Sequence, residues 1–276
     1  MRTVIDALRG FAPERFFREY FGKRPVVIQE SISHWPASRH WSLDYLKRCY
    51  GDAMVTVTRY DPEANSTFLD QTLADVHHAV PLRDFLSMLE WGDRRYAVRE
   101  DTALLRRLPQ LIEELERFSP FSSHASTSDG RYKALWIGPP GYVTGLHTDP
   151  GDTMLFQLHG RKHVLLFAPD QTQFLYEKDR EERQQKFDGA PLQSRLDSSE
   201  FGVLRDQVRW CDVQPFDPDV DRFPLFRQAH CIEAYICPGD ALYIPDQWWH
   251  AVRSLDPTIS VSIEPSFDGR LFQSEA

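Results

Sequence analysis

The second half of the chain consists of short apolar runs separated by turn residues. Runs such as ALWIG, DTMLFQLHG, KHVLLFAPD and TISVSIEP are brief, and Gly, Pro or Asp stands between them. None continues with the 3.6-residue periodicity that a helix of ordinary length needs. Many short strands with turn signals are typical of an antiparallel barrel or jelly roll. This half of the chain therefore predicts a mainly β fold.

The first half has a different texture, in which helix and strand patterns alternate. PERFFREYFGKR places aromatic residues at helical spacing, and Ser42 opens SLDYLKRCYGD as an N-cap residue, with Gly51 at the end. PVVIQE and MVTVTRY have the composition of strands. We expect a mixed α/β part over residues 1–130 that packs on a jelly-roll core of residues 131–276, all within a single domain.

One long polar stretch, residues 171–230, interrupts the expected strands. Its charge run YEKDREERQQK predicts a helix with a solvated face. Such an insertion can also cover a binding site.

Composition narrows the classes of function. The formal charge of −9 argues against broad, non-specific binding of nucleic acid. The 4 cysteines form no CxxC pair, which is typical of reduced thiols in an intracellular protein. We find neither a secretory signal pattern nor an apolar stretch of the roughly 18 residues that span a bilayer. We therefore expect a cytoplasmic protein that does not enter a membrane.

Two histidines and an aspartate are the first candidates for chemistry. In a strand His147 and Asp149 project to one side, and His250, in GDALYIPDQWWHAV, is the best candidate for a third ligand. Two histidines and one carboxylate suit non-haem Fe(II) and leave coordination positions open. A histidine and an aspartate at this spacing also occur by chance, and a surface turn at Asp-Pro-Gly-Asp is the alternative.

Lys162 is the second unusual polar residue. Strand alternation puts Lys162, Val164 and Leu166 on one face of KHVLLFAP. If that face points into the barrel, the ammonium needs an anionic partner such as a dicarboxylate. The alternative is a lysine exposed to water at a hairpin turn.

Together these segments resemble the cupin-like JmjC family of Fe(II)- and 2-oxoglutarate-dependent oxygenases, in particular its small hydroxylase branch. The resemblance covers nearly the whole chain, and its strongest parts are LWIGPPGYVTGLHTDPGDTMLFQLHGRKHVLLFAPDQ and CIEAYICPGDALYIPDQWWHAV. It implies a double-stranded β-helix of the jelly-roll type, with N-terminal helices and a helical insertion. It also implies Fe(II) as cofactor, 2-oxoglutarate as cosubstrate and dioxygen as oxidant.

The resemblance further implies a role for individual residues. The iron ligands are His147, Asp149 and His250, which are thereby the catalytic centre. Lys162 holds the distal carboxylate of 2-oxoglutarate. The remaining cosubstrate contacts are Thr144, Tyr96, Thr153, where relatives carry asparagine or serine, and Ser262.

The strand SVSIEP departs from the family pattern. Relatives commonly carry asparagine and aromatic residues there, and this chain has Ser260, Ser262 and Glu264. Ser262 is our candidate for the cosubstrate contact, although the sequence does not decide which residue of this strand makes it.

The function expected from the resemblance is hydroxylation of a side chain in a protein or peptide. One alternative is a small molecule or a modified tRNA base as substrate, which a basic surface would favour; its arginines would be Arg94, Arg95, Arg99, Arg106 and Arg107. Another is a cupin that binds metal without turnover. By analogy, HxD favours hydroxylation over demethylation. Both a monomer and a homodimer fit the sequence.

Overall fold

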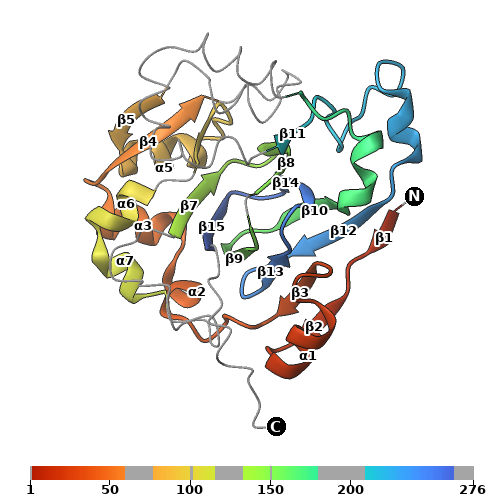
Figure 1. Ribbon diagram of the computed structural model, residues 1–276. Helices are drawn as coiled ribbons and strands as arrows, with labels where there is room; N and C mark the ends of the chain where they lie inside the picture. The colour runs from red at the N-terminus through yellow and green to blue at the C-terminus, as the bar shows by residue number, and fades with distance from the viewer. Residues whose placement is uncertain are drawn as a thin grey trace.

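The computed structural model describes residues 2–59, 77–99, 102–115, 133–149, 151–179 and 209–263. Its centre is a pair of facing β-sheets (Figure 1). The core strands are β7 (Lys133–Gly138), β8 (Val143–Thr148), β9 (Thr153–His159), β10 (Lys162–Phe167), β12 (Cys231–Ile236), β13 (Ala241–Ile244), β14 (Trp249–Ser254) and β15 (Thr258–Ile263).

The order of these strands is that of a double-stranded β-helix. The small sheet contains β12, β10, β14 and β8 as neighbours, and the large sheet contains β13, β9, β15 and β7. All of these pairs are antiparallel. From β7 to β10 and from β12 to β15 the chain passes from one sheet to the other at each step. The mainly β jelly-roll fold expected from the sequence is confirmed.

Further strands, most of them from the first half of the chain, extend both sheets. β1 (Arg2–Val4) runs parallel to β12 in the small sheet, which β11 (Arg209–Trp210) extends beside β8. In the large sheet β2 (Ala7–Arg9) and β3 (Val26–Gln29) join β13. At the other edge β6 (Tyr96–Val98), β4 (Met54–Arg59) and β5 (His77–Pro81) follow β7. The result is a 6-stranded and a 9-stranded sheet.

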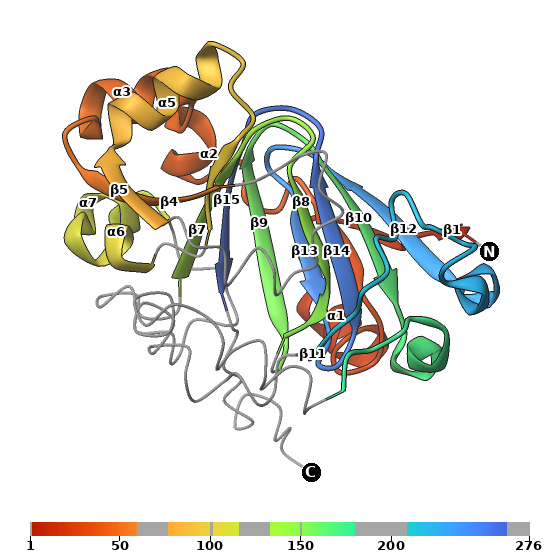
Figure 2. The same cartoon turned by 90° about the horizontal axis from the view of Figure 1, so that it is seen from above.

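The helices of the first half cover the outer face of the large sheet. They are α1 (Pro13–Glu19), α2 (Pro36–His40), α3 (Leu43–Tyr50), α5 (Leu82–Glu90), α6 (Thr102–Arg107) and α7 (Pro109–Glu113). Ser42 caps α3 as expected, because its side chain accepts a hydrogen bond from the Tyr45 amide. Figure 2 shows α3 and α5 together at the β4–β5 end of the large sheet, whereas α2 lies against β9. None of the helices in the described ranges is long and apolar enough to cross a membrane.

The insertion is built from short elements where it is described. It contains the 3₁₀ helices η3 (Pro169–Phe174) and η5 (Pro224–Gln228) and the strand β11. Most of the charge run YEKDREERQQK lies outside the described residues, so the helix expected there stays a prediction.

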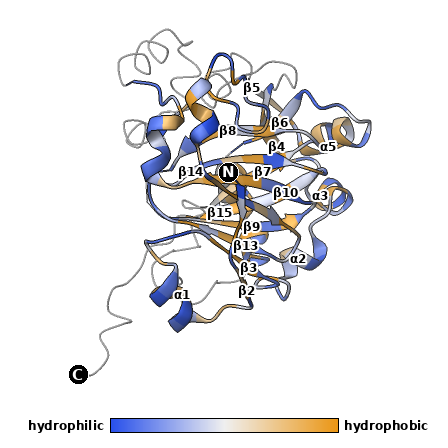
Figure 3. Ribbon diagram, turned by 90° about the vertical axis from the view of Figure 1, so that its right-hand side faces the viewer, coloured by the Kyte–Doolittle hydropathy of each residue, from blue (hydrophilic) through white to orange (hydrophobic). Residues whose placement is uncertain are grey.

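Alternation along the strands separates three apolar layers. Leu155, Leu242 and Ile244 of the large sheet meet Val164 and Leu166 of the small sheet inside the barrel. On the outer side of the large sheet Phe156, Tyr243 and Val261 pack with side chains of the helices, among them Phe16, Leu46 and Leu82. A third cluster, including Leu165, Phe167 and Trp249, lies outside the small sheet. Figure 3 shows hydrophobic residues along the strands and hydrophilic ones on peripheral helices such as α1.

The cluster on the outer side of the large sheet predicts that both halves of the chain unfold together. Phe16 of α1 is 0% exposed, and its ring lies 4.9 Å from that of Tyr243 in β13. We expect Phe16→Ala to lower the free energy of unfolding by about 3–5 kcal/mol, because it leaves a cavity. Chemical denaturation should show one transition, shifted as a whole.

The matched control is Arg18→Ala in the same helix. The Arg18 side chain is 69% exposed, so its loss should change stability by less than about 0.5 kcal/mol. A separate early transition in Phe16→Ala, with an unshifted second one, would contradict the single-domain organisation.

Candidate metal and cosubstrate site

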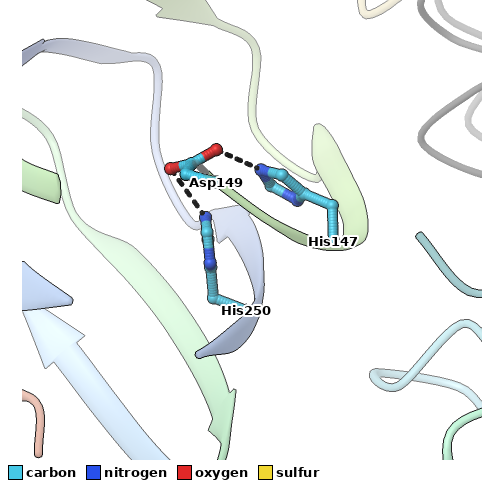
Figure 4. Close-up of side chains that lie close together, drawn as sticks. All are labelled: His147, Asp149 and His250. Carbon is cyan, nitrogen blue, oxygen red and sulfur yellow. Dashed lines mark ion pairs between the residues drawn. The ribbon is translucent and has the colours of Figure 1, made fainter. Parts of the chain in front are cut away.

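The strand register of the small sheet brings two histidines together. His147 of β8 and His250 of β14 are direct cross-strand partners, and their ring centroids lie 4.1 Å apart. Asp149 follows the end of β8 by one residue. Figure 4 shows its carboxylate facing both imidazole rings, with one oxygen toward each. The three residues that the sequence singled out as ligands therefore share one place.

The geometry of this cluster matches a metal centre. His147 Nε2 lies 3.5 Å from Asp149 Oδ1, and His250 Nε2 lies 3.5 Å from Asp149 Oδ2. One ligand atom from each of the three residues lies within 4.8 Å of the others. The remaining ring nitrogens are bound to backbone carbonyls: His147 Nδ1 to Gly145 at 2.8 Å and His250 Nδ1 to Trp248 at 3.1 Å.

These backbone bonds fix which ring nitrogen carries the proton. A carbonyl oxygen only accepts, so each neutral ring must hold its hydrogen on Nδ1 and present the Nε2 lone pair to the carboxylate. Burial, together with the neighbouring His147, lowers the pKa of His250 to about 4. The pKa of Asp149 lies below its usual range, since burial acts to raise it but His250, His147 and a bond from Thr153 lower it more. A carboxylate and lone pairs that converge in this way fit a divalent cation.

Residues around the cluster hold its ligands in place. Thr153 Oγ1 donates to Asp149 Oδ2 at 2.9 Å. The loop after Asp149 and the turn before His250 are joined by two bonds: Gly151 N to Asp246 Oδ1, and Asp246 N to Asp152 Oδ1, both 2.9 Å. Such outer contacts orient metal ligands. Sequence reasoning missed the roles of Asp152 and Asp246, although both stand beside the ligand motifs.

An ion pair and a cation–π contact hold the same strands on their outer side. Arg209 of β11 is the cross-strand partner of Thr148. Its guanidinium donates two hydrogen bonds to the Glu177 carboxylate, at 2.7 and 2.6 Å. It also lies 4.9 Å above the Trp249 ring, which packs in the cluster outside the small sheet. Trp249 is thus a core residue, whereas Trp248 packs with the cluster inside the barrel.

A β-bulge decides which side chains share the inner face with the metal ligands. His250 pairs with His147, but Val252 pairs with Thr144, so β8 has one residue more than β14 over this interval. Directly opposite residues point to the same face. Thr144 therefore faces inward with His147, although strict alternation would place them on opposite sides.

Lys162 lies on this inner face as well. It pairs with Ser254 of β14, and Leu166 of the same strand pairs with His250. Its side chain is buried, and burial lowers its pKa to about 7. No hydrogen bond or ion pair joins its ammonium to another of the described residues. The exposed-lysine alternative does not hold, and the buried amine lacks the anion that would compensate its charge.

The other predicted cosubstrate contacts differ in position. Ser262 of β15 pairs with the inward-facing Leu155 and accepts a bond from Trp136 Nε1 at 3.0 Å, so it lines the interior. Tyr96, in contrast, is half-buried at the start of β6 and packs against the cluster outside the large sheet. The structure does not bring it to the ligands. Glu264 lies outside the described residues.

The arginines named for an RNA surface give that alternative little support. Arg95 is paired with Asp93 at 2.7 Å, and Arg107 donates to the backbone of Met54. The Arg106 side chain lies outside the description.

Comparison with known proteins agrees with this geometry. A family model described as a cupin-like domain matches residues 13–263. The human bifunctional peptidase and (3S)-lysyl hydroxylase JMJD7 is 28% identical over 261 residues, which cover 91% of this chain and 80% of that protein. Lysine-specific demethylase 8 of Danio rerio is 30% identical over 90% of this chain and 55% of its own length. Human HSPB1-associated protein 1 is 28% identical over 94% of this chain and 51% of its own length.

This chain thus spans about half the length of the last two relatives. The family match extends over most of the chain and includes both ligand-bearing strands. The chain belongs to the cupin-like JmjC family of Fe(II)- and 2-oxoglutarate-dependent oxygenases.

Proposed function

We propose that this protein is a 2-oxoglutarate-dependent dioxygenase that hydroxylates a side chain of a protein or peptide. The observation that carries the proposal is the presence of two features on one inner face of the barrel. His147, Asp149 and His250 converge as metal ligands, and Lys162 is a buried amine without a described partner. One feature calls for a cation and the other for an anion.

Different residues would hold Fe(II) and 2-oxoglutarate. His147, Asp149 and His250 would hold Fe(II), and Lys162 would hold the distal carboxylate of 2-oxoglutarate by a charge-assisted hydrogen bond. Thr144 and Ser262, which also face inward, would add hydrogen bonds; the role of Tyr96 stays a prediction. When bound, Fe(II) with 2-oxoglutarate and dioxygen supplies the oxidising power to hydroxylate an unreactive C–H bond.

The protein itself supplies the positions of the ligands and an apolar surrounding. Thr153 fixes the rotation of the Asp149 carboxylate, and the backbone bonds fix both imidazoles. Leu155, Val164 and Leu166 wall the interior with apolar surface, which strengthens the electrostatic interactions made there.

The printed names of the relatives support a protein substrate. One is a lysyl hydroxylase and another a lysine-specific demethylase, so both act on lysine side chains. A small molecule or a tRNA base is the second candidate substrate. The ligand set together with a buried Lys162 argues against a cupin without turnover, because such a protein has no need of both. We place the protein in the cytoplasm, supported by cysteines that form no disulfide.

Anaerobic titration tests the proposal. We expect Fe(II) followed by 2-oxoglutarate to produce the visible charge-transfer band of the chelate in the wild type. The band should be lost or much weakened in His147→Ala, which loses a ligand, and in Lys162→Ala, which loses the anchor. No band in well-folded wild-type protein would rule the oxygenase out.

The substrate class is tested in cell lysate. Wild-type protein with Fe(II), 2-oxoglutarate and air should add one oxygen atom to a peptide, as seen by mass spectrometry. Asp149→Ala is the matched inactive control. A gain of oxygen only in small molecules or in RNA would move the proposal to the second candidate substrate.

The pKa of Lys162 predicts how cosubstrate binding depends on pH. In the free protein this pKa is about 7, and binding requires the charged ammonium. Above pH 7 binding must therefore take up a proton, so the Kd of 2-oxoglutarate should rise by up to about tenfold per pH unit. Anaerobic titrations at about pH 7 and 8.5 would measure this. Lys162→Arg stays charged and should lack the dependence; an equal slope in both proteins would contradict the assignment.

Burial of Lys162 also predicts a cost in stability. Without cosubstrate, Lys162→Met should raise the free energy of unfolding by about 1–4 kcal/mol, because it replaces a buried unpaired cation with an apolar side chain. The pKa of about 7 in the folded protein lies below the ordinary lysine pKa of 10.5, so wild-type stability rises with pH between these values. The advantage of Lys162→Met should accordingly be largest near pH 6 and shrink by about pH 9.

Urea denaturation at the two pH values measures this difference. Lys23→Met, at an exposed lysine, is the control and should change little. A Lys162→Met variant less stable than the wild type at pH 6 would show that the ammonium is compensated in the free protein.

A further inference from the structure

The turn that leads into Lys162 is held from inside the barrel by a buried glutamine. We propose that Gln157 is a positioning residue for Lys162 and thereby sets the affinity for the distal carboxylate of 2-oxoglutarate. This inference rests on the proposed function and adds a residue to it.

The contacts of Gln157 are fully specified. Its Nε2 donates to the backbone carbonyls of His159 at 2.7 Å and Gly160 at 2.9 Å. Its Oε1 accepts from Ser260 Oγ at 2.8 Å, and both side chains are 0% exposed. Both amide hydrogens and the amide oxygen are therefore used, and the reverse orientation would set oxygen against two carbonyls.

The carbonyls that Gln157 binds belong to the β9–β10 turn. Gly160 and Arg161 are the only residues between the two strands, and Lys162 is the first residue of β10. Ile259 pairs with His159 but Ser260 pairs with Gln157, so a bulge in β9 lies just before the turn. At this bulge the glutamine amide ties the end of β9 to β15.

Other hydrogen bonds hold the outer side of the turn. Arg161 Nε and Nη2 donate to the Asp256 carboxylate at 2.7 and 3.1 Å, and Leu255 N donates to the Arg161 carbonyl at 2.9 Å. Gly160 has a φ of +67° and lies directly against the Pro257 carbonyl. These contacts fix the path of the turn along the surface, while Gln157 fixes it on the side that faces the barrel interior.

Lys162 depends on this turn because its own side chain has no polar anchor. None of the hydrogen bonds or ion pairs among the described residues involves its ammonium, so the backbone at the start of β10 decides where the ammonium lies. Displacements of about 1 Å weaken charge-assisted contacts strongly. Loss of the Gln157 bonds should therefore weaken binding of the distal carboxylate and leave the metal ligands intact.

The test compares two 2-oxo acids on the Fe(II)-loaded protein without oxygen. 2-Oxoglutarate carries the distal carboxylate, and 2-oxobutyrate lacks it. In Gln157→Met, which keeps the length of the side chain but makes none of its hydrogen bonds, we expect the Kd of 2-oxoglutarate to rise about tenfold or more. The Kd of 2-oxobutyrate and the affinity for Fe(II) should stay within about threefold of the wild type.

A double-mutant cycle with Lys162→Met separates positioning from general damage. If Gln157 acts through Lys162, adding Gln157→Met to Lys162→Met should not change the Kd of 2-oxoglutarate further. Ser260→Ala, which removes only the donor that orients the Gln157 amide, should show the same selectivity at smaller size. It also provides the test if Gln157→Met does not fold.

Three results would overturn the role proposed for Gln157. An unchanged Kd for 2-oxoglutarate in Gln157→Met and Ser260→Ala would overturn the inference. So would an equal loss for both 2-oxo acids, or an additive loss in the Lys162→Met background, since either indicates a structural role alone. If the wild type itself binds no 2-oxoglutarate, the proposed function fails, and this inference fails with it.

Discussion

Each ligand histidine uses its one N–H on a backbone carbonyl, and the rest of the site depends on that arrangement. The bonds from His147 to Gly145 and from His250 to Trp248 leave the Nε2 lone pairs facing Asp149. Lone pairs and a carboxylate repel one another unless a cation lies between them. The jelly roll tolerates this cluster because the strands that carry it are fastened elsewhere, by the cross-strand ladder and by the pair of Asp152 and Asp246.

The barrel also carries a buried cationic group, the Lys162 ammonium, whose charge has no partner in the described part of the chain. A ligand that bridges the metal and this ammonium would account for both. Lys162 is buried on the same face of β10 as Val164 and Leu166, and no hydrogen bond joins its ammonium to another of the described residues. A core selected for stability alone would place an apolar side chain there. A site that binds a dicarboxylate at a metal gains from both groups, since the ligand brings negative charge to the ammonium and completes the coordination of the cation. The residues that lower the stability of the free protein would then be the ones that bind its ligands.

The sequence predicted the parts of this arrangement that follow from strand periodicity. His147 and Asp149 share a face because they are two residues apart, and the alternation of Lys162 with Val164 and Leu166 placed the lysine correctly once the inner face was known. Alternation fails at Thr144, three residues before His147, because the bulge in β8 reverses the faces. It also gives no sign that Thr153 orients Asp149, although only four residues separate them, or that Gln157 fastens a turn, since the orientation of its amide depends on Ser260, which is distant in sequence. The side chain of Tyr96 packs against the cluster on the outer side of the large sheet, and its predicted contact with the cosubstrate stays a prediction.

If Lys162 holds the cosubstrate as proposed, its distance along β10 from the metal ligands explains why a long side chain stands at this position. Leu166 is the residue of β10 opposite His250, and Lys162 lies four positions before it, opposite Ser254. At the rise of an extended strand this places the two backbone positions about 13 Å apart. A serine or threonine at position 162 would end far from any ligand bound at the metal, whereas a long, flexible chain with a charged tip can reach toward it. The same length makes the tip sensitive to the direction in which the chain leaves the strand. A long anchor therefore needs a rigid base, and the base of Lys162 is a two-residue turn tied down on both of its sides.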